Sequence, residues 1–336
     1  MGYYICVYSG NLLPVRSVHC GSILELLIAP VRCSSPPVGY ARLLHTVIDC
    51  NYHRMRLLDA PSNTDRLLES FGYVASTPKD NNCLRGHVIH ATKIPEDYST
   101  VVKCVRMGDS EARMMAYFYA LRKQGKSLPV VGVLDLIEDK PSSTLLVVLE
   151  DWGCNLAELG KLIPLDFFHI LRQCFEAVVT LHAMGIAHLD ISCYNFLCNS
   201  NKQVAVIDFE ASRCFNETAH SRCQTRSRSH SIYPHRTTEI PPEFRTEDAH
   251  QRRHCAYKLD IFALGVLILR FAKSSGFDCP RLVLLAEPLV ACDPMRRPTA
   301  VEALVWFHKW CERVGVVLPS TDTRTNEHAP KHRAFS

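Results

Sequence analysis

The strongest constraint on the fold is a long apolar stripe over residues 165–184. Its apolar side chains recur every three or four residues, at Leu165, Phe168, Leu171, Phe175, Val178 and Leu181. This spacing predicts one amphipathic helix with a continuous apolar face. Because such a face needs a second layer to bury it, we expect the helix to lie in the core of a helical region.

The chain before this helix has a different pattern. A helix is predicted at residues 109–124, where Ala112, Met115 and Tyr119 recur near one face and Gly125 follows as a stop. Strands first and helices afterwards predict an α+β protein with two lobes. Short apolar runs rich in β-branched residues predict strands at residues 86–92, 99–105, 130–136 and 144–149.

Composition excludes several classes of protein. Hydrophobic residues make up 47% and charged residues 21% of 336 residues, which is typical of a globular protein. The net charge of +4 is too small and too scattered to favour a nucleic-acid partner. No run approaches the ~18 apolar residues that span a bilayer, and the first residues lack the basic segment of a signal peptide. We therefore expect no membrane association and an intracellular location, cytoplasmic or nuclear.

The chain holds 16 cysteines, none of them in C-x-x-C spacing. Structural zinc is therefore disfavoured, and we expect most of these thiols to be reduced and buried. Residues 1–82 carry no recognisable motif and are left unassigned, folded or poorly ordered, apart from a short helix predicted at residues 64–71. Residues 83–315 form the organised domain, and residues 316–336 are polar and expected to be disordered.

A second pattern in the sequence consists of polar residues at fixed spacing that could carry out a reaction. The string IAHLDISCYNFL places His188, Asp190 and Asn195 in H-x-D-x-x-x-x-N spacing, and VAVIDFE places Asp208 after a second strand. Phosphoryl transfer needs a carboxylate that holds the attacking hydroxyl, Mg²⁺ on the phosphates and a cation against the triphosphate. Asp190 suits the first task. Asn195 and Asp208 supply the oxygen ligands that Mg²⁺ prefers.

These residues and their order resemble the eukaryotic protein kinases over residues 83–315. Lys103 in VVKCV matches the lysine that this family places on a strand against the phosphates, and Glu111 matches its helix partner. His188 matches the histidine that orients the catalytic loop. The resemblance implies a small β-rich N-terminal lobe and a mainly helical C-terminal lobe, with ATP and Mg²⁺ as cofactors. Glu111 has an alternative, because only eight positions separate it from Lys103 and a helix dipole also stabilises an acid in the first turn.

Further motifs of this family follow in order along the chain. Glu150 and Trp152 in EDWG look like the hinge that receives adenine. Asp260 in DIFALGVLIL resembles the aspartate that anchors the catalytic loop. Glu243 in PPE and Arg297 in RRPTAVEAL resemble a structural ion pair of the family. The strings DFE and RPTAVEAL are similar to divergent kinase-like families expanded in fungi.

Four positions depart from the family pattern. Gly86 is the one glycine where the family has a glycine-rich phosphate loop, and Glu210 replaces the glycine of D-F-G. Leu189 replaces the arginine of H-R-D, which disfavours a switch that grips a phosphorylated activation loop. Ser192 stands where serine/threonine kinases carry a lysine.

Three functions remain open from these observations. The first is an ATP- and Mg²⁺-dependent protein kinase acting on serine or threonine, with a protein substrate and a monomeric chain. The second is a pseudokinase, which binds nucleotide or partners without turnover, as the departures above favour. The third is a small-molecule kinase similar to choline or aminoglycoside phosphotransferases, which share H-x-D-x-x-x-x-N but lack the P-P-E and R-P-T strings.

Overall fold

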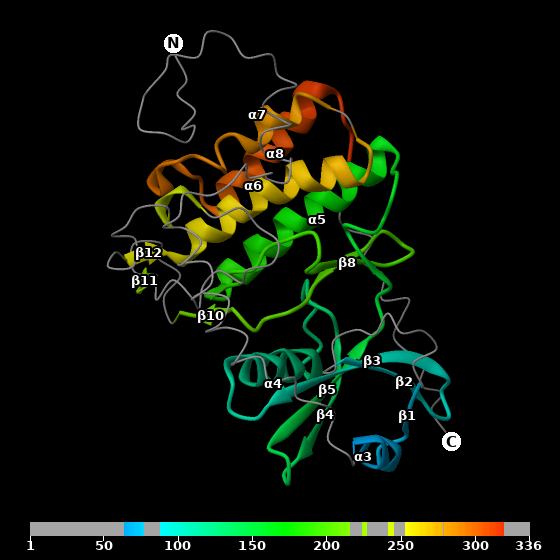
Figure 1. The fold of residues 1–336 in the computed structure, drawn as a ribbon. Coiled ribbons are helices and arrows are strands. Elements are labelled where there is room, and N and C mark those ends of the chain that lie inside the picture. The colour runs from blue at the N-terminus through cyan, green and yellow to red at the C-terminus, as the bar shows by residue number, and fades with distance from the viewer. Residues whose placement is uncertain are drawn as a thin grey trace, which may run out of the picture.

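The computed structural model describes residues 64–76, 88–215, 224–226, 241–244, 253–277 and 279–318 of the chain. These residues form two lobes, a smaller one built on a curled sheet and a larger helical one (Figure 1). The α+β class and the two-lobed arrangement are therefore confirmed.

The smaller lobe contains one five-stranded antiparallel sheet in the order β1-β2-β3-β5-β4. The predicted strands are confirmed, and a fifth, β1, precedes them. The bounds are β1 (Tyr73–Ala75), β2 (Val88–Lys93), β3 (Tyr98–Arg106), β4 (Val133–Asp139) and β5 (Thr144–Glu150). β3 lies at the centre, where Lys103 is opposite Val88 of β2 and Val147 of β5.

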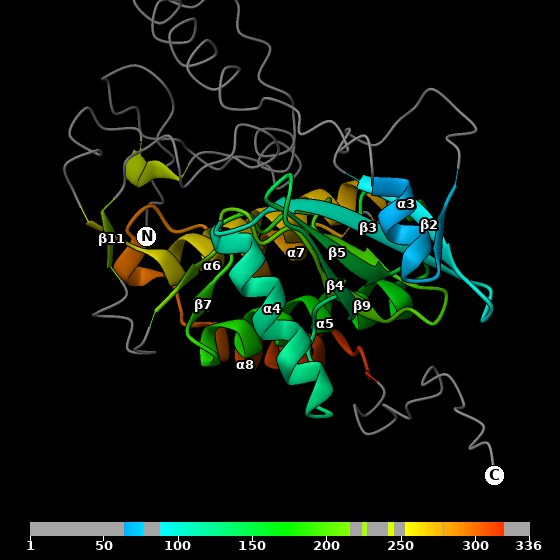
Figure 2. The same cartoon turned by 90° about the horizontal axis from the view of Figure 1, so that it is seen from below.

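Two helices cover this sheet at separate places (Figures 1 and 2). α3 (Thr64–Ser70) is the predicted short helix, and its Leu68 is fully buried among side chains of the sheet. α4 (Ser110–Lys123) buries Met115 and Phe118 in the core that the two lobes share. Both α3 and β1 precede residue 83, so the sheet includes part of the stretch that the sequence leaves unassigned.

Among the described residues, four α-helices build the larger lobe. They are α5 (Pro164–Ala183), α6 (Ala256–Ser274), α7 (Leu282–Ala286) and α8 (Ala300–Val314). The apolar stripe of α5 is buried except for Leu165 in the first turn, which is 47% exposed. α6 is buried almost all round, so it forms the centre of this lobe. α8 begins at a capping box between Thr299 and Glu302 and ends at Gly315, whose φ of 75° suits glycine.

The remaining described elements are short strands and 3₁₀ turns. A three-stranded ladder joins β6, β8 and β9, while β7 pairs with β10 and β11 with β12. The bounds are β6 (Cys154–Asn155), β7 (Ile186–Ala187), β8 (Phe196–Cys198), β9 (Val204–Val206), β10 (Arg213–Cys214), β11 (Gln224–Arg226), η1 (Pro242–Phe244), β12 (Arg253–Cys255) and η3 (Pro294–Arg296). In the described part of the chain, no helix has the length and apolar character that crossing a membrane requires.

Candidate active site

Lys103 joins the two lobes through a pair of carboxylates. Its Nζ lies 2.5 Å from Glu111 Oε1 and 3.0 Å from Asp208 Oδ1. Burial alone would lower the pKa of Lys103, but Asp208 and Glu111 outweigh that effect and raise it. The site therefore holds a permanent ammonium charge between two acids.

Local structure explains why Glu111 reaches Lys103 over only eight positions. Side chains alternate along β3, so Val102 and Cys104 enter the core of the sheet while Lys103 points to the other face. Gly108, with φ of 91°, turns the chain directly from β3 into α4. Glu111 is 5% exposed in the first turn of α4, so it is no solvated dipole partner. Burial raises its pKa, which Lys103 only partly offsets.

The loop between β7 and β8 brings Asp190 and Asn195 together. Asn195 Nδ2 donates hydrogen bonds to the Asp190 carbonyl at 2.9 Å and to Asp190 Oδ2 at 2.8 Å. The other carboxylate oxygen, Asp190 Oδ1, is buried and accepts no hydrogen bond from any described residue. A buried carboxylate oxygen without a donor is expected where a substrate hydroxyl is to bind.

The pKa of Asp190 is raised to about 6, chiefly by burial. The hydrogen bond from Asn195 opposes this rise, and the charges of Asp208 and Glu210 add to it. Asp190 is therefore largely ionised at neutral pH and takes up a proton in mildly acidic solution.

Asp260 on α6 fixes the backbone of this loop. Its two carboxylate oxygens accept hydrogen bonds from the N–H groups of His188 at 2.8 Å and Leu189 at 2.7 Å, and His182 Nε2 lies 3.0 Å away. The His188 ring accepts from the Asp190 N–H through Nδ1, so its Nε2 donates to the Ile207 carbonyl at 3.0 Å. Burial lowers the pKa of His188, so a neutral ring bridges the loop and the strand end.

The residues present fit a magnesium ion. The Ile207 N–H donates to the Asn195 carbonyl at 3.0 Å, which draws the segment carrying Asp208 against the catalytic loop. Because the amide nitrogen of Asn195 donates to Asp190, its amide oxygen is the atom that can serve as a metal ligand. A carboxylate and an amide oxygen are the donors that Mg²⁺ prefers in proteins.

The hinge, residues 150–153, follows β5 between the lobes. Glu150 Oε1 lies 2.5 Å from Arg122, and Trp152 Nε1 donates to Glu150 Oε2 at 2.9 Å. Asp151 Oδ2 accepts from Ser99 Oγ at 2.7 Å, which ties the hinge to β3. The side chains of Glu150 and Trp152 therefore bind each other.

Arg297 and Glu243 form a buried bidentate pair in the helical lobe. Arg297 Nη1 and Nη2 donate to the two oxygens of Glu243 at 2.7 and 2.6 Å. Arg297 is 1% exposed, and it also donates to the carbonyls of Lys258 and Ala291. This pair joins η1 to α6 and to the turn before α8.

The departures from the family pattern have distinct surroundings. Leu189 is buried with Tyr257 and Leu259, so an apolar contact occupies the position of the family's arginine. Ser192 is buried, and its hydroxyl makes no hydrogen bond within the described part of the chain. Glu210 is exposed beside the acids of the site. Gly86 lies outside the described residues.

The sequence does not predict three residues that position the site. They are His182 beside Asp260, Ser212, whose hydroxyl donates to the His188 carbonyl at 3.1 Å, and Arg122 beside Glu150. His182 has a sequence signal, because it is a polar residue within the apolar pattern of α5. Ser212 and Arg122 meet partners far along the chain, so no local pattern indicates them.

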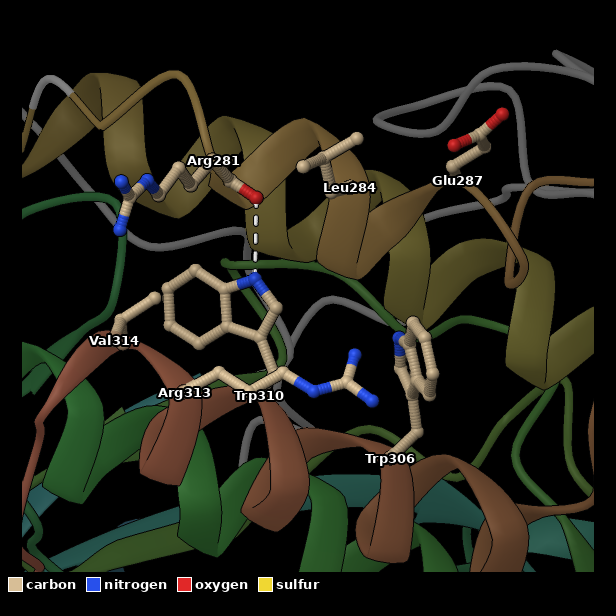
Figure 3. A pocket seen from close by; sticks show the side chains of 7 residues that line it. All are labelled: Arg281, Leu284, Glu287, Trp306, Trp310, Arg313 and Val314. Carbon is tan, nitrogen blue, oxygen red and sulfur yellow. Dashed lines mark hydrogen bonds between the residues drawn. The ribbon is translucent and has the colours of Figure 1, made fainter.

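A hollow lies on the helical lobe between α7 and α8 (Figure 3). It has a volume of about 410 Å³ and is lined by Trp306 and Trp310, by Arg281 and Arg313, and by Leu284, Glu287 and Val314. Trp310 Nε1 donates to the Arg281 carbonyl at 3.3 Å. Glu287 is the one acid in its lining, so this hollow lacks the set of oxygen ligands found around Lys103.

Comparisons with known proteins agree with this geometry. The protein kinase domain family matches residues 85–277. The serine/threonine-protein kinase hal4 of Schizosaccharomyces pombe is 30% identical over 148 residues, which are 42% of this chain and 21% of hal4. The hormonally up-regulated neu tumor-associated kinase of Mus musculus is 24% identical over 140 residues, which are 41% of this chain and 18% of that kinase. The chain thus spans about a fifth of the length of these curated relatives. Because the family match covers more than half of the sequence, the chain belongs to the protein kinase domain family.

Proposed function

We propose that this chain transfers the γ-phosphate of ATP to a serine or threonine hydroxyl of a protein substrate, with Mg²⁺ as cofactor. The observation that carries this proposal is the convergence of Lys103, Asp208 and Asp190 at the junction of the lobes, with Asn195 bonded to Asp190. These groups supply the cation, the metal ligands and the hydroxyl acceptor that the reaction needs.

Lys103 binds the phosphates as a fixed positive charge. Glu111 of the smaller lobe and Asp208 of the helical lobe both bind the Lys103 ammonium and hold it in place. A charge held in place before the substrate arrives costs no reorganisation during the reaction.

Asp190 receives the acceptor hydroxyl. Asn195 occupies Oδ2, so the serine or threonine hydroxyl donates its hydrogen bond to Oδ1. Asp260 and the neutral ring of His188 keep the carboxylate in this position through the loop backbone. As the hydroxyl oxygen attacks, its proton moves toward Oδ1.

Asn195 and Asp208 would hold the metal. Bound there, Mg²⁺ neutralises charge on the phosphate oxygens and orients them. Because Lys103 contacts Asp208, the residue that would bind the phosphates lies beside a residue that would hold the metal.

A nucleotide-binding pseudokinase is the second candidate. The specific observation in its favour is Ser192, whose buried hydroxyl makes no hydrogen bond with the described residues where active serine/threonine kinases carry a lysine. Without that ammonium the γ-phosphate loses one stabilising charge. This candidate shares ATP binding with the first and differs in turnover.

Transfer of labelled γ-phosphate from ATP to a protein or peptide library tests the proposal. We expect Mg²⁺-dependent label on serine or threonine, which phosphoamino acid analysis identifies. Label on small molecules such as choline or an aminoglycoside, tested in parallel, would overturn the protein-kinase assignment. ATP binding without transfer to any acceptor would favour the pseudokinase.

A further inference from the structure

Two cysteines lie directly opposite each other beside the hinge. Cys154 on β6 pairs with Cys198 on β8 in the antiparallel register. Both thiols are free. Directly opposite residues of a ladder project to the same face of the sheet, so the two side chains are neighbours.

Backbone geometry sets the separation of this pair. The Leu156 N–H donates to the Phe196 carbonyl at 3.0 Å, two residues along each strand from the cysteines. The pair Cys154 and Cys198 therefore occupies a hydrogen-bonded position, where Cα atoms are about 5.5 Å apart. Disulfides in proteins join Cα atoms about 4.4 to 6.8 Å apart and Cβ atoms about 3.5 to 4.5 Å apart. The Cα separation of this pair suits the bond, and its Cβ atoms, about 5 Å apart in such a ladder, must approach by about 1 Å.

The chain that leads into β6 also lies close to β8. A side-chain carbon added at Gly153 would lie 3.6 Å from the Cys198 carbonyl oxygen. The end of the hinge thus lies against β8. Formation of the bond requires rotation of the two side chains and a small shift of the two-residue strand β6 toward β8.

The two thiols differ in access. Cys154 is partly exposed, whereas Cys198 is 3% exposed and its Sγ lies 3.5 Å from the Asn199 carbonyl. Burial raises the pKa of Cys198 to about 11, with Lys202 opposing that rise. Cys154 is therefore the thiol that meets an oxidant from solution, and Cys198 is the resolving partner.

We propose that Cys154 and Cys198 form a reversible oxidation site, in which a peroxide converts the pair into an intrachain disulfide. Cys154 sulfur attacks one oxygen of hydrogen peroxide, the O–O bond breaks, and a sulfenic acid and one water form. Cys198 sulfur then attacks Cys154 sulfur, and the sulfenic hydroxyl leaves as a second water. Two thiols and one peroxide thus give one disulfide and two waters.

The bond has a clear structural consequence. Cys154 follows the hinge directly, and Cys198 lies on the strand that begins one residue after Asn195. The disulfide therefore fixes the hinge to the strand that leaves the catalytic loop. The proposal concerns the thiol pair alone and does not depend on whether the chain transfers phosphate.

Peptide mapping of the full chain tests this site. The folded protein is treated with hydrogen peroxide, free thiols are blocked, and the digest is analysed by mass spectrometry without reduction. We expect a peptide pair joined through Cys154 and Cys198 that dithiothreitol separates. The thermal midpoint of the oxidised chain should rise by ~5 °C, because the bond closes a long loop in the unfolded state.

Three variants make the outcome decisive. In Cys198→Ser, dimedone should trap a sulfenic acid at Cys154, since the resolving thiol is gone. In Cys154→Ser, Cys198 should stay reduced. Cys292→Ser alters an exposed cysteine far along the chain and should leave the joined peptide unchanged. Absence of the joined peptide in the wild-type chain, or Cys154 joined to a different cysteine, would overturn the proposal.

Discussion

Among single residues, Asp190 has the environment that bears most directly on the proposed reaction. Asn195 binds one carboxylate oxygen, the other has no donor among the described residues, and burial raises the pKa to about 6. A base with this pKa is ionised at neutral pH yet still basic enough to draw a proton from a hydroxyl. The raised pKa of Asp190 thus follows from burial, and the position of its carboxylate from the contact with the Asn195 amide.

A pH dependence follows from this value. The pKa of Asp190 is raised from 3.8, so its carboxylate takes up a proton as the pH falls through about 6. We expect the rate of phosphoryl transfer to fall on the acid side with a midpoint near that pH. The measurement is the single-turnover rate between pH 5 and pH 8, and a rate independent of pH across this range would contradict the role of Asp190.

The substitution Asp190→Asn tests the same residue directly. It removes the base but keeps the shape of the side chain, so transfer should slow by about 10²–10⁴-fold while ATP still binds. Asp109→Asn makes the same chemical change at the exposed N-cap of α4, where the side chain caps nothing, and should leave the rate unchanged. Equal rates for the wild-type chain and Asp190→Asn would refute the assignment.

The spacing of residues in the sequence predicts the residues of the site itself better than it predicts the residues that hold them in position. Lys103 and Asp208 are in contact, as the order of the motifs implies. Glu111, whose short spacing from Lys103 left its role open, joins them because Gly108 turns the chain directly from β3 into α4. The contact of Arg122 with Glu150 depends on how α4 lies against β5, which no local pattern encodes.

At the scale of elements, α6 positions the catalytic loop through one side chain. Asp260 accepts two loop N–H groups, one on each oxygen. The substitution Asp260→Asn leaves one acceptor oxygen for two donors, so one buried N–H loses its partner. We expect a loss of about 1–3 kcal/mol in the free energy of unfolding. Displacement of Asp190 should also slow transfer by about 10²-fold.

Two measurements on Asp260→Asn check this prediction: chemical denaturation gives the free energy of unfolding, and a kinetic assay gives the rate of phosphoryl transfer. If Asp260→Asn lowered stability without slowing transfer, Asp260 would serve the fold of α6 and not the loop. Wild-type values of both quantities would contradict the hydrogen-bond arrangement itself.

Several long elements of the fold are predictable from the sequence, whereas the shortest strands are not. α5 follows from its periodic apolar stripe, and β3 and β5 follow from their β-branched runs. β6 and β8 span only two or three residues, too few for any periodicity. Their pairing is set by the chain segments that hold them, which is also why the thiol pair has no signal in the sequence.

At the scale of the whole molecule, the Arg297–Glu243 pair connects segments far apart in the chain. Arg297→Met removes one partner and leaves the Glu243 carboxylate without its counter-charge, which costs about 3–5 kcal/mol in buried pairs. Its neighbour Arg296 is exposed and lies 3.9 Å from Asp293, so Arg296→Met should cost at most about 1 kcal/mol. Urea unfolding of both variants provides the comparison, and equal costs would contradict the importance of the buried pair.

We propose that residues from both lobes together bind one metal–nucleotide pair. The most direct measurement is the stability of the chain with ATP, with and without Mg²⁺, in the wild-type protein and in Asp208→Ala. At about 100 times the dissociation constant, ATP with Mg²⁺ should stabilise the wild-type chain by about 2.7 kcal/mol. Asp208→Ala should lose the Mg²⁺-dependent part of this gain while it remains folded. Equal stabilisation of both proteins, or none in the wild-type chain, would contradict the claim.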